Sequence, residues 1–539
     1  MKKVTDHNSK PPDQPHPAFR RFLSIPLVLL FVFGTFRSRA QFYSLPSEYF
    51  FSLPLEKTLS TYDSSLHSGF KPYVQGFSIK YTVPSDTAVF YRSKKNQKLT
   101  DALFNDHLIH LRSKNTEKDY FDVFLDPILN FEFGKDLSDA SGEKLYTNTR
   151  GLLAGGHLGK TIYFETILSE NQSFFPYYLD SFALANKVVP GQGRWKPYKT
   201  TGYDYAFSSG FVSVQAGKHL NIQFGHGKHK IGNGYRSLFL SDNAFNYPYV
   251  RFTQQWFKGR LQYSNLYTVF MNLVPALENP PPATEPLYQK KAASFQYLSV
   301  KLNKRLTLGF FQSLMWEPAD GKNQQHLDAR YFNPVIFTNL AAFGLADSKH
   351  NLMLGAELNF KLTKSLSIYG QFGMDDVQPI GYSFNEGTGA QSGLRYFDAF
   401  GLNGLFLQAE YNYTGKAQYS STDTIATIPY YTHYNQNLAS AFTNGNELVF
   451  LGNYTYKRFF VNAKYNYQER GTLNAQPAFT TQLLQGKIGY VLNPAYNLII
   501  YLSVNGRLQN FDNFSRTYNE TRYVSIGLKT GLYNLYYDF

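Results

Sequence analysis

Apolar and polar residues alternate along most of the chain after about residue 120. The stretches 354–360, 407–413 and 461–468 place apolar or aromatic side chains at every second position, with polar residues or glycine between them. Successive side chains of a strand point to opposite faces, so each stretch predicts a strand with one apolar and one polar face. Segments of about ten residues have the length of a tilted membrane-crossing strand. Residues 533–539 alternate in the same way and predict that the chain ends inside a strand.

The connections between these segments come in two sizes. Short turns are expected at 258–260, 303–304, 362–365 and 456–458, and long Gly/Pro-rich or polar loops at 273–292, 375–403 and 415–446. Short turns on one side and long loops on the other are typical of outer-membrane barrels, which have an even number of strands. The sequence therefore predicts an all-β fold, a transmembrane antiparallel β-barrel of about 18 strands over residues 120–539. The terminal aromatic Phe539 is the kind of signal that outer-membrane assembly machinery recognises, so this machinery is an expected partner.

The first forty residues have the organisation of an export signal. Lys2, Lys3, Arg20 and Arg21 precede an apolar run over 22–36, and the small-x-small triplet at 38–40 ends the segment. Residues 1–40 thus predict a cleaved signal peptide, because the run is shorter than an ordinary membrane-spanning helix. A single N-terminal anchor helix is the alternative.

The stretch 41–119 alternates poorly and has clustered charges at 92–95 and 112–119. It predicts a small N-terminal extension, partly helical, that lies in the periplasm or plugs the barrel. Another short helix is expected to begin at Asn333-Pro334, because Asn is a good N-cap and Pro suits the first helical position. One or two short helices are therefore expected beside the strands.

Composition supports a membrane barrel. Aromatic residues make up 17% of the chain, with 43 Tyr and 48 Phe, yet the mean hydropathy is −0.36. A barrel reconciles these values, because lipid-facing and lumen-facing residues alternate and aromatic girdles form at both membrane interfaces. The chain has no cysteine, which excludes lipid attachment to an N-terminal Cys. The net charge of +14 suits lipid head groups or an anionic glycan, and an exported barrel is not expected to bind nucleic acid.

The segment 224–244 is the densest unusual motif, with four glycines and several basic residues close together. One interpretation is a basic pocket for an anionic ligand such as surface polysaccharide. Its candidate ligand-binding residues are His226, Lys228, Arg236, Asp242 and Asn243. The other interpretation is an inward-folded loop held by glycine turns and by ion pairs of Arg236. A metal site at His226 and His229 lacks a nearby third ligand, so neither a metal nor another cofactor is expected.

Part of this motif resembles known families. Residues 231–234 and 238–244 (IGNG, LFLSDNA) resemble the conserved segment of the capsule-assembly Wzi family, a W-G-x-G element followed by L-x-L-S-x-N-A, with Ile231 in place of the aromatic residue. The stretches 224–241, 330–337 and 433–439 resemble the gliding-motility RemB-like proteins of Bacteroidota, and they occur in the expected order as landmarks spread over most of the range 200–470. The last stretch departs from that family, with Asn437 where Pro is usual and Ser440-Ala441 where His-Pro is usual. The resemblance implies a non-enzymatic outer-membrane barrel at the cell surface, linked to surface polysaccharide or to gliding.

Several functions remain open at this point. The first is a surface barrel that binds or organises exopolysaccharide, and the alternative is a diffusion porin or transporter channel with a wet lumen. A barrel hydrolase would require His433 and Ser440 to meet within hydrogen-bond reach. Asp375-Asp376 could bind calcium in an outer loop. Adhesin or scaffold roles complete the set.

Overall fold

The structure is a computed structural model that describes residues 48–60, 67, 69–73, 103–113, 121–159, 161–275, 287–317, 329–344, 350–375, 386–419, 430–440, 442–472, 477–511 and 518–539. Residues 38–539 form one compact unit. The expected signal peptide and the charge cluster at 92–95 lie outside the described residues.

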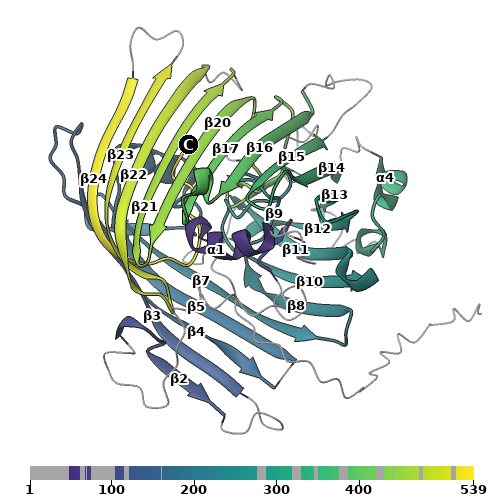
Figure 1. Ribbon diagram of the computed structural model, residues 1–539. Helices are drawn as coiled ribbons and strands as arrows, with labels where there is room; N and C mark the ends of the chain where they lie inside the picture. Colours follow the sequence, from purple (N-terminus) through teal and green to yellow (C-terminus); the bar gives the residue numbers. More distant parts are fainter. Residues whose placement is uncertain are drawn as a thin grey trace, which may run out of the picture. The chain divides into compact units, whose positions relative to one another are not determined.

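Eighteen antiparallel strands close into a barrel, as the sequence predicts (Figure 1). The ring closes where β24 (Tyr518–Thr530) pairs with β3 (Phe121–Asp136), with Val524 opposite Lys135. The other spanning strands, in ring order, are β4 (Leu145–Leu158), β5 (Ile162–Phe174), β7 (Gly202–Gln215), β8 (Leu220–Gly227), β10 (Tyr247–Trp256), β11 (Leu261–Pro275), β12 (Tyr288–Lys301), β13 (Leu306–Trp316), β14 (His350–Lys361), β15 (Leu366–Asp375), β16 (Thr388–Phe397), β17 (Leu405–Thr414), β20 (Gly445–Tyr456), β21 (Phe459–Arg470), β22 (Phe479–Asn493) and β23 (Leu498–Phe511).

Shorter elements lie inside the ring or at its rims. The short strands are β1 (Phe70–Lys71), β2 (Ile109–Arg112), β6 (Lys196–Tyr198), β9 (Lys230–Ile231), β18 (Thr432–His433) and β19 (Gln436–Asn437). The helices are α1 (Tyr49–Ser60), α3 (Tyr177–Asn186) and α4 (Thr338–Phe343), with 3-10 turns η2 (Phe257–Gly259), η3 (Ala329–Phe332) and η4 (Ala399–Gly401). None of the helices in the described ranges is long and apolar enough to cross a membrane.

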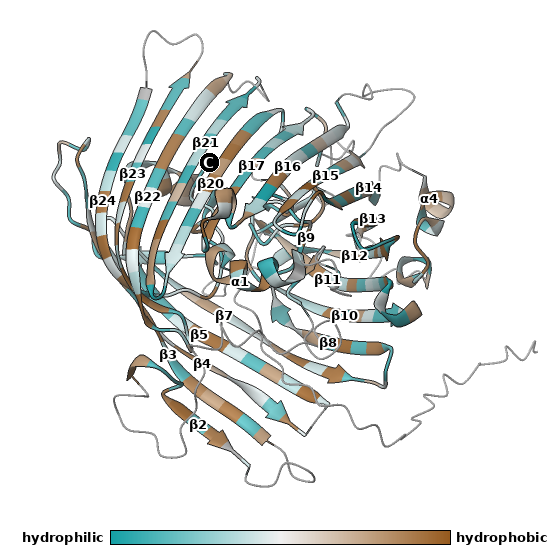
Figure 2. Cartoon of the chain, viewed as in Figure 1, coloured by the Kyte–Doolittle hydropathy of each residue, from teal (hydrophilic) through white to brown (hydrophobic). Residues whose placement is uncertain are grey.

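Hydrophobic and hydrophilic residues alternate along many of the strands (Figure 2). Burial places the apolar residues on the outer face and largely polar residues on the inner face. Ile488, Leu502 and Ile526 lie side by side on β22, β23 and β24, and each exposes about half of its side chain or slightly more. The next positions point inward, where Ser503 and Ser525 are buried. A closed barrel has no unpaired strand edge, so it can expose an apolar band to lipid with every backbone group bonded. This architecture is that of an outer-membrane barrel.

The connections confirm the predicted asymmetry. The short turn between β4 and β5 lies at one end of the barrel, which we call the short-turn side. The turns 216–219, 257–260, 302–305, 362–365, 398–404, 457–458 and 494–497 lie at the same end. The longer connections lie at the other end, the loop side. In the outer-membrane layout the loop side faces outward from the cell.

Three details differ from the expectation. The helix expected from Asn333-Pro334 begins only at Thr338, because the Asn333 side chain instead accepts the Val335 N–H and closes a turn. Helix α3 was not expected, so three short helices are present in the described ranges rather than one or two. The expected loop 375–403 contains strand β16, whose glycine and small polar residues weaken its alternation.

The C-terminal segment also differs, because the last strand ends at Thr530 and residues 531–539 turn back into the lumen (Figure 1). The prediction that 533–539 is a strand was therefore wrong. The alternation has another cause: Tyr536 and Asp538 bond polar groups of the lumen, while Tyr533 stacks on Phe207 with ring centres 4.3 Å apart. The C-terminal segment packs one face against polar groups of the lumen and the other against aromatic rings. Its side chains therefore alternate between polar and aromatic, as they would in a strand that faces lipid on one side.

Candidate functional site

The motif singled out in the sequence forms a loop that folds into the barrel. It leaves β8 at Gly227, crosses the lumen through β9 and returns to the wall at Tyr247. A Cβ atom at Gly234 would lie 2.4 Å from Glu410 Oε2 and 2.9 Å from the Arg236 carbonyl oxygen, so a larger residue would displace the groups that hold this loop. The interpretation of the motif 224–244 as an inward-folded loop is confirmed from residue 228 onward, while residues 224–227 belong to β8. We refer to residues 228–246 as the inward loop.

Acidic and amide side chains of the barrel wall hold the inward loop by its backbone. Glu357 of β14 accepts the N–H of Asn233 at 3.0 Å, and Glu410 of β17 accepts the N–H groups of Tyr235 and Arg236 at 2.6 and 3.0 Å. Gln371 of β15 accepts the Leu238 N–H at 2.9 Å. Backbone N–H groups turned toward carboxylates form charge-assisted hydrogen bonds, which are stronger than neutral ones. The polar half of the predicted alternation therefore positions this loop.

Arg236 is the main ionic anchor of the inward loop. Its Nη2 donates to Glu447 Oε1 at 2.7 Å and its Nε donates to Glu447 Oε2 at 3.1 Å. Its Nη1 lies 3.1 Å from Asp538 Oδ1, and its Nη2 donates to the Asp538 carbonyl at 3.1 Å. Burial opposes its charge, but Asp538 and Glu447 outweigh burial and raise the pKa of Arg236. The predicted ion pairs are thus present, and they occupy the guanidinium that was a candidate for ligand binding.

Lys228 and Asp242 lie together where the inward loop meets the C-terminal segment. Lys228 Nζ donates to the Gly191 carbonyl at 2.6 Å and to the Asp242 carbonyl at 3.3 Å. Burial lowers the pKa of Lys228 to about 8. The Asp242 carboxylate accepts Tyr536 Oη at 2.8 Å and Asn534 Nδ2 at 2.9 Å. Both residues therefore tie lumen segments together.

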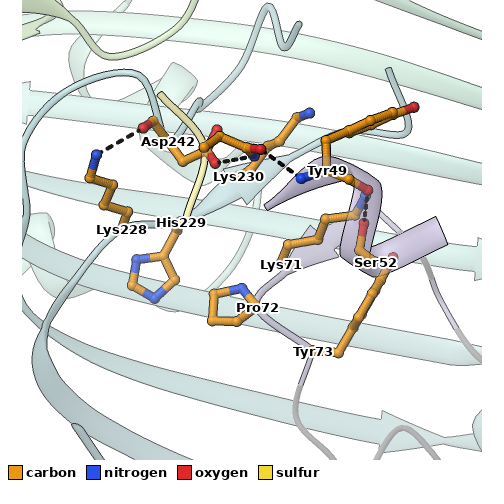
Figure 3. A pocket seen from close by; sticks show the side chains of 10 residues that line it. Tyr49, Ser52, Lys71, Pro72, Tyr73, Lys228, His229, Lys230 and Asp242 are labelled. Carbon is orange, nitrogen blue, oxygen red and sulfur yellow. Dashed lines mark hydrogen bonds between the residues drawn. The ribbon is translucent and has the colours of Figure 1, made fainter. Parts of the chain in front are cut away.

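A small cavity lies beside Lys228 and Asp242 (Figure 3). Its volume of about 40 Å³ would hold roughly three waters, at about 10–15 Å³ for each water centre, so a sugar ring does not fit. The remaining lining residues come from α1, from β1 and the two residues after it, from the inward loop and from the C-terminal segment: Tyr49, Ser52, Lys71, Pro72, Tyr73, His229, Lys230 and Asn534. The cavity therefore lies between the N-terminal segment and the inward loop, and it is too small to be a glycan site.

The other two candidate residues lie elsewhere. His226 shares the outward face of β8 with Phe224, and its Nδ1 lies 3.2 Å from the Ser208 carbonyl. Asn243 Nδ2 donates to the Asn437 carbonyl at 3.3 Å. The five predicted residues therefore occupy several places and do not converge on one pocket.

A surface that the sequence did not single out lies on the loop side near His226. Phe245 stacks on Tyr434 with ring centres 5.4 Å apart and an interplanar angle of 11°. His226 meets Phe245 edge-on at 5.9 Å, and the Arg194 guanidinium lies 5.0 Å from the Tyr288 ring. The hairpin that carries Tyr434 also contacts the segment just before Arg194, because Gln436 Oε1 accepts the Gly191 N–H at 2.6 Å and Gln436 Nε2 donates to the Gln192 carbonyl at 3.4 Å. We call Arg194, His226, Phe245, Tyr288 and Tyr434 the loop-side aromatic cluster.

The cluster was not predictable as a unit, because its members come from five separate parts of the chain. Tyr434 sits at the tip of the β18–β19 hairpin with a φ of 49°, and its N–H donates to the Met271 carbonyl at 2.9 Å. Phe245 belongs to the inward loop and Tyr288 begins β12. The available signal was the tyrosine-rich stretch 412–434, which marked an aromatic loop but not its neighbours.

The hydrolase and metal hypotheses receive no support from the geometry. His433 Nδ1 accepts the Met271 N–H at 3.0 Å, and its Nε2 lies 3.1 Å from the Asn246 carbonyl, so neither nitrogen points to Ser440. In the described ranges, no group of three or more His, Asp or Glu is arranged to hold a metal ion. Asp375 is buried and accepts the Tyr419 N–H at 2.8 Å, while Asp376 lies outside the described residues.

No protein-family model and no curated protein matches the sequence. Among solved structures, the chain is similar to Wzi of Escherichia coli, described as an outer-membrane protein involved in Group 1 capsule assembly and a carbohydrate-binding β-barrel. The two are 13% identical with a TM-score of 0.48, over 76% of this chain and 85% of Wzi. OccAB2 of Acinetobacter baumannii is 11% identical with a TM-score of 0.43, over 75% of this chain and 97% of that one. OprD of Pseudomonas aeruginosa is 11% identical with a TM-score of 0.41, over 77% and 97%. These values assign no function, and the fold described above rests on the strand pairing itself.

Proposed function

We propose that this protein is a non-enzymatic outer-membrane barrel that binds surface polysaccharide at its loop-side aromatic cluster. The observation that carries the proposal is the stacked pair Phe245–Tyr434 beside Arg194 and Tyr288, on the side that faces outward in the outer-membrane layout. The apolar C–H face of a sugar ring packs against an aromatic face, and Arg194 would attract the acidic groups of an anionic polysaccharide.

The cluster is held by rigid neighbours, which favours a binding surface. Asn435, next to Tyr434, donates to the Asn186 carbonyl of α3 at 3.2 Å, and Gln436 Oε1 accepts the Gly191 N–H at 2.6 Å. Aromatic rings that are already ordered lose little conformational entropy when a ligand binds. His226 belongs to the cluster and Asn243 lies two residues before Phe245, so part of the predicted ligand-binding set is kept in this proposal.

The contents of the lumen favour a binding role over a diffusion channel. The inward loop, the C-terminal segment and α1 all lie within the ring and bond its inner wall (Figure 1). Apolar side chains of the inward loop also pack with Tyr431 and Leu438, so part of the lumen is a hydrophobic core. A porin needs a water-filled path, and a wide barrel without a plug provides one. Steady current across a planar bilayer would contradict our proposal and favour the channel.

A retention assay on the purified barrel tests the proposal. Tyr434→Ala and Arg194→Ala are compared with the unchanged chain for binding to an immobilised acidic polysaccharide. We expect Tyr434→Ala to weaken binding about tenfold, because central aromatic anchors contribute most of the energy of an interface. Tyr177→Ala is the matched control, since Tyr177 is an exposed loop-side aromatic residue outside the cluster. Equal retention by all four proteins would remove the cluster as the binding site.

The N-terminal segment 41–119 is proposed to close the short-turn side as a plug. Lys57 of α1 lies 2.7 Å from Asp398, and Ser60 Oγ donates to the Lys364 carbonyl at 3.0 Å, so α1 contacts two short turns. Deeper in the lumen, β1 pairs with β9, and Arg251 lies 3.9 Å from the Phe70 ring. Helix α1 and strand β1 are therefore bonded to the barrel or its contents, and β2 pairs with β3 of the wall.

Finer roles rest on the sequence alone. A link to capsule assembly or to gliding motility follows from the resemblance to the Wzi and RemB-like families and stays a prediction. A deletion strain that keeps normal capsule retention and normal surface spreading would contradict both. Export by the signal peptide and recognition by the outer-membrane assembly machinery are likewise predictions. The inward position of Phe539 makes β24 the better candidate for the segment that the machinery reads.

A further inference from the structure

The short turns of the barrel are strongly basic. Within the described residues of the eight turns there are eight Lys or Arg and a single acid, Asp398. The exposed basic residues include Lys258, Arg260, Lys304, Arg305, Lys364 and Lys457. The loop side has no such bias, because acids such as Asp139, Glu143 and Asp180 stand among its basic residues. The two rims therefore present different charges to the two leaflets of a membrane.

On this rim, basic residues follow exposed apolar ones. Phe257 precedes Lys258 and exposes 75% of its side chain, and Tyr456 precedes Lys457 and exposes 58%. Leu362, which is 40% exposed, lies two residues before Lys364. In two of these turns the residues take the left-handed conformation, with φ of 52° and 58° at Phe257 and Lys258, and 54° at Lys457. An exposed apolar residue followed closely by a basic residue thus recurs around the rim.

We propose that this rim binds the head groups of anionic phospholipids in the leaflet that it faces. An aromatic or leucine side chain sits at the edge of the hydrocarbon, and a neighbouring ammonium or guanidinium extends to the phosphate level. No described carboxylate lies within 4 Å of Lys258, Arg260, Lys364 or Lys457. Their charge therefore has no ionic partner within the described part of the chain, and a phosphodiester anion supplies one. This inference concerns the barrel wall and does not depend on the polysaccharide proposal.

Trp256 provides a reporter for the test. It precedes Phe257 at the short-turn end of β10, on the same outward face as Val250, and is half-buried. The other two tryptophans, Trp195 and Trp316, follow α3 and end β13, on the loop side. Subtracting the fluorescence of a Trp256→Phe variant from that of the full chain isolates the signal of Trp256.

The experiment measures quenching of Trp256 by brominated lipids in reconstituted vesicles. Brominated phosphatidylglycerol is compared with brominated phosphatidylcholine at equal mole fraction and low salt. We expect phosphatidylglycerol to associate about fivefold more strongly, since each basic residue near an anionic surface contributes about 1 kcal/mol. The preference should fall as salt is raised, because the charges are exposed. Inorganic phosphate at the same ionic strength should not abolish it, which separates a lipid from a free anion.

Paired variants locate the effect. The double variant Lys258→Gln with Arg260→Gln should bring the ratio of phosphatidylglycerol to phosphatidylcholine association close to one. The double variant Lys196→Gln with Lys199→Gln, on the loop side, should leave this ratio unchanged. The heat-dependent shift of the barrel on SDS gels confirms that each variant is folded. Three results would overturn the proposal. In the unchanged chain, both lipids could quench Trp256 equally, or neither lipid could quench it. In the variant that combines Lys258→Gln with Arg260→Gln, the preference for phosphatidylglycerol could persist.

Discussion

The outer and inner faces of the barrel are made by the same strands but are held by different physics. On β22–β24 the outer face is a band of aliphatic side chains such as Ile488, Leu502 and Ile526, each with neighbours of the same kind. On β14, β17 and β20 the inner face places Glu357, Glu410 and Glu447 against the inward loop. The outer face needs only apolar surface, because lipid makes no directional bonds. The inner face needs particular groups at particular distances.

The difference shows where substitution is tolerated. An exchange of one aliphatic residue for another outside changes little, whereas removal of one partner inside leaves a buried charge without compensation. The inner face therefore holds the residues whose identity matters most for the ordered interior.

Loss of Arg236 should have the largest effect. Arg236→Met leaves Glu447 and Asp538 buried without their shared cation, which costs about 3–5 kcal/mol of stability. The measurement is the temperature at which the folded band is lost on SDS gels. Arg522→Met is the control, because Arg522 is 64% exposed and its pair with Glu520 is worth about 1 kcal/mol or less. If both variants lowered this temperature equally, the inner face would tolerate substitution as well as the exposed surface does.

A charge on the outer face should have the next largest effect. Ile488→Lys places an ammonium group in the apolar band and should cost about 2–4 kcal/mol if the site lies near the mid-plane of the membrane. Ile488→Val is the control and should change stability by about 1.5 kcal/mol or less. The same gel assay after refolding into lipid measures both variants. Unchanged stability of Ile488→Lys would place this face in water and would contradict the membrane assignment.

Acid should produce the smallest effect. Burial alone would raise the pKa of Asp538, but Arg236 and Lys464 together hold it below the ordinary value of 3.8. A carboxyl with a lowered pKa in the folded state adds stability that is fully present above the unfolded pKa and is lost as pH falls toward the folded pKa. The contribution should therefore be constant near pH 7 and fall by only a few tenths of a kcal/mol by pH 4. Thermal unfolding followed by circular dichroism between pH 7 and pH 3 checks this. In Asp538→Asn this part of the pH dependence should be absent, and an identical slope in both proteins would contradict the assignment.

Much of the wall was predictable from the sequence. The stretches 354–360, 407–413 and 461–468 lie within β14, β17 and β21, with their apolar residues on the outer face. The inference from alternation to a membrane strand was wrong at 533–539. Alternation shows that the two faces of a segment meet different environments, but it does not show whether one of them is lipid. Tyr533 and Asp538 meet such environments inside the lumen. β16 escaped detection because small residues carry little alternation.

The candidate site was predictable only in part. Basic residues and glycines marked the inward loop correctly, and Arg236 was correctly expected to form ion pairs. Its partners Glu447 and Asp538 lie more than two hundred residues away in the sequence, so nothing near the motif could identify them. The loop-side aromatic cluster depends in the same way on how five separate parts of the chain meet at one rim.

The sequence by itself determined that the chain forms a closed barrel of about eighteen strands, with short turns at one end and long loops at the other. It could do so because alternation and turn length are local properties that strand geometry and the membrane both require. Only the tertiary structure decided what fills the lumen and which side chains share the loop-side rim. Those contacts join residues that are hundreds of positions apart in the sequence. Barrel closure and strand register decide which of these residues meet, and no residue nearby in the sequence does so.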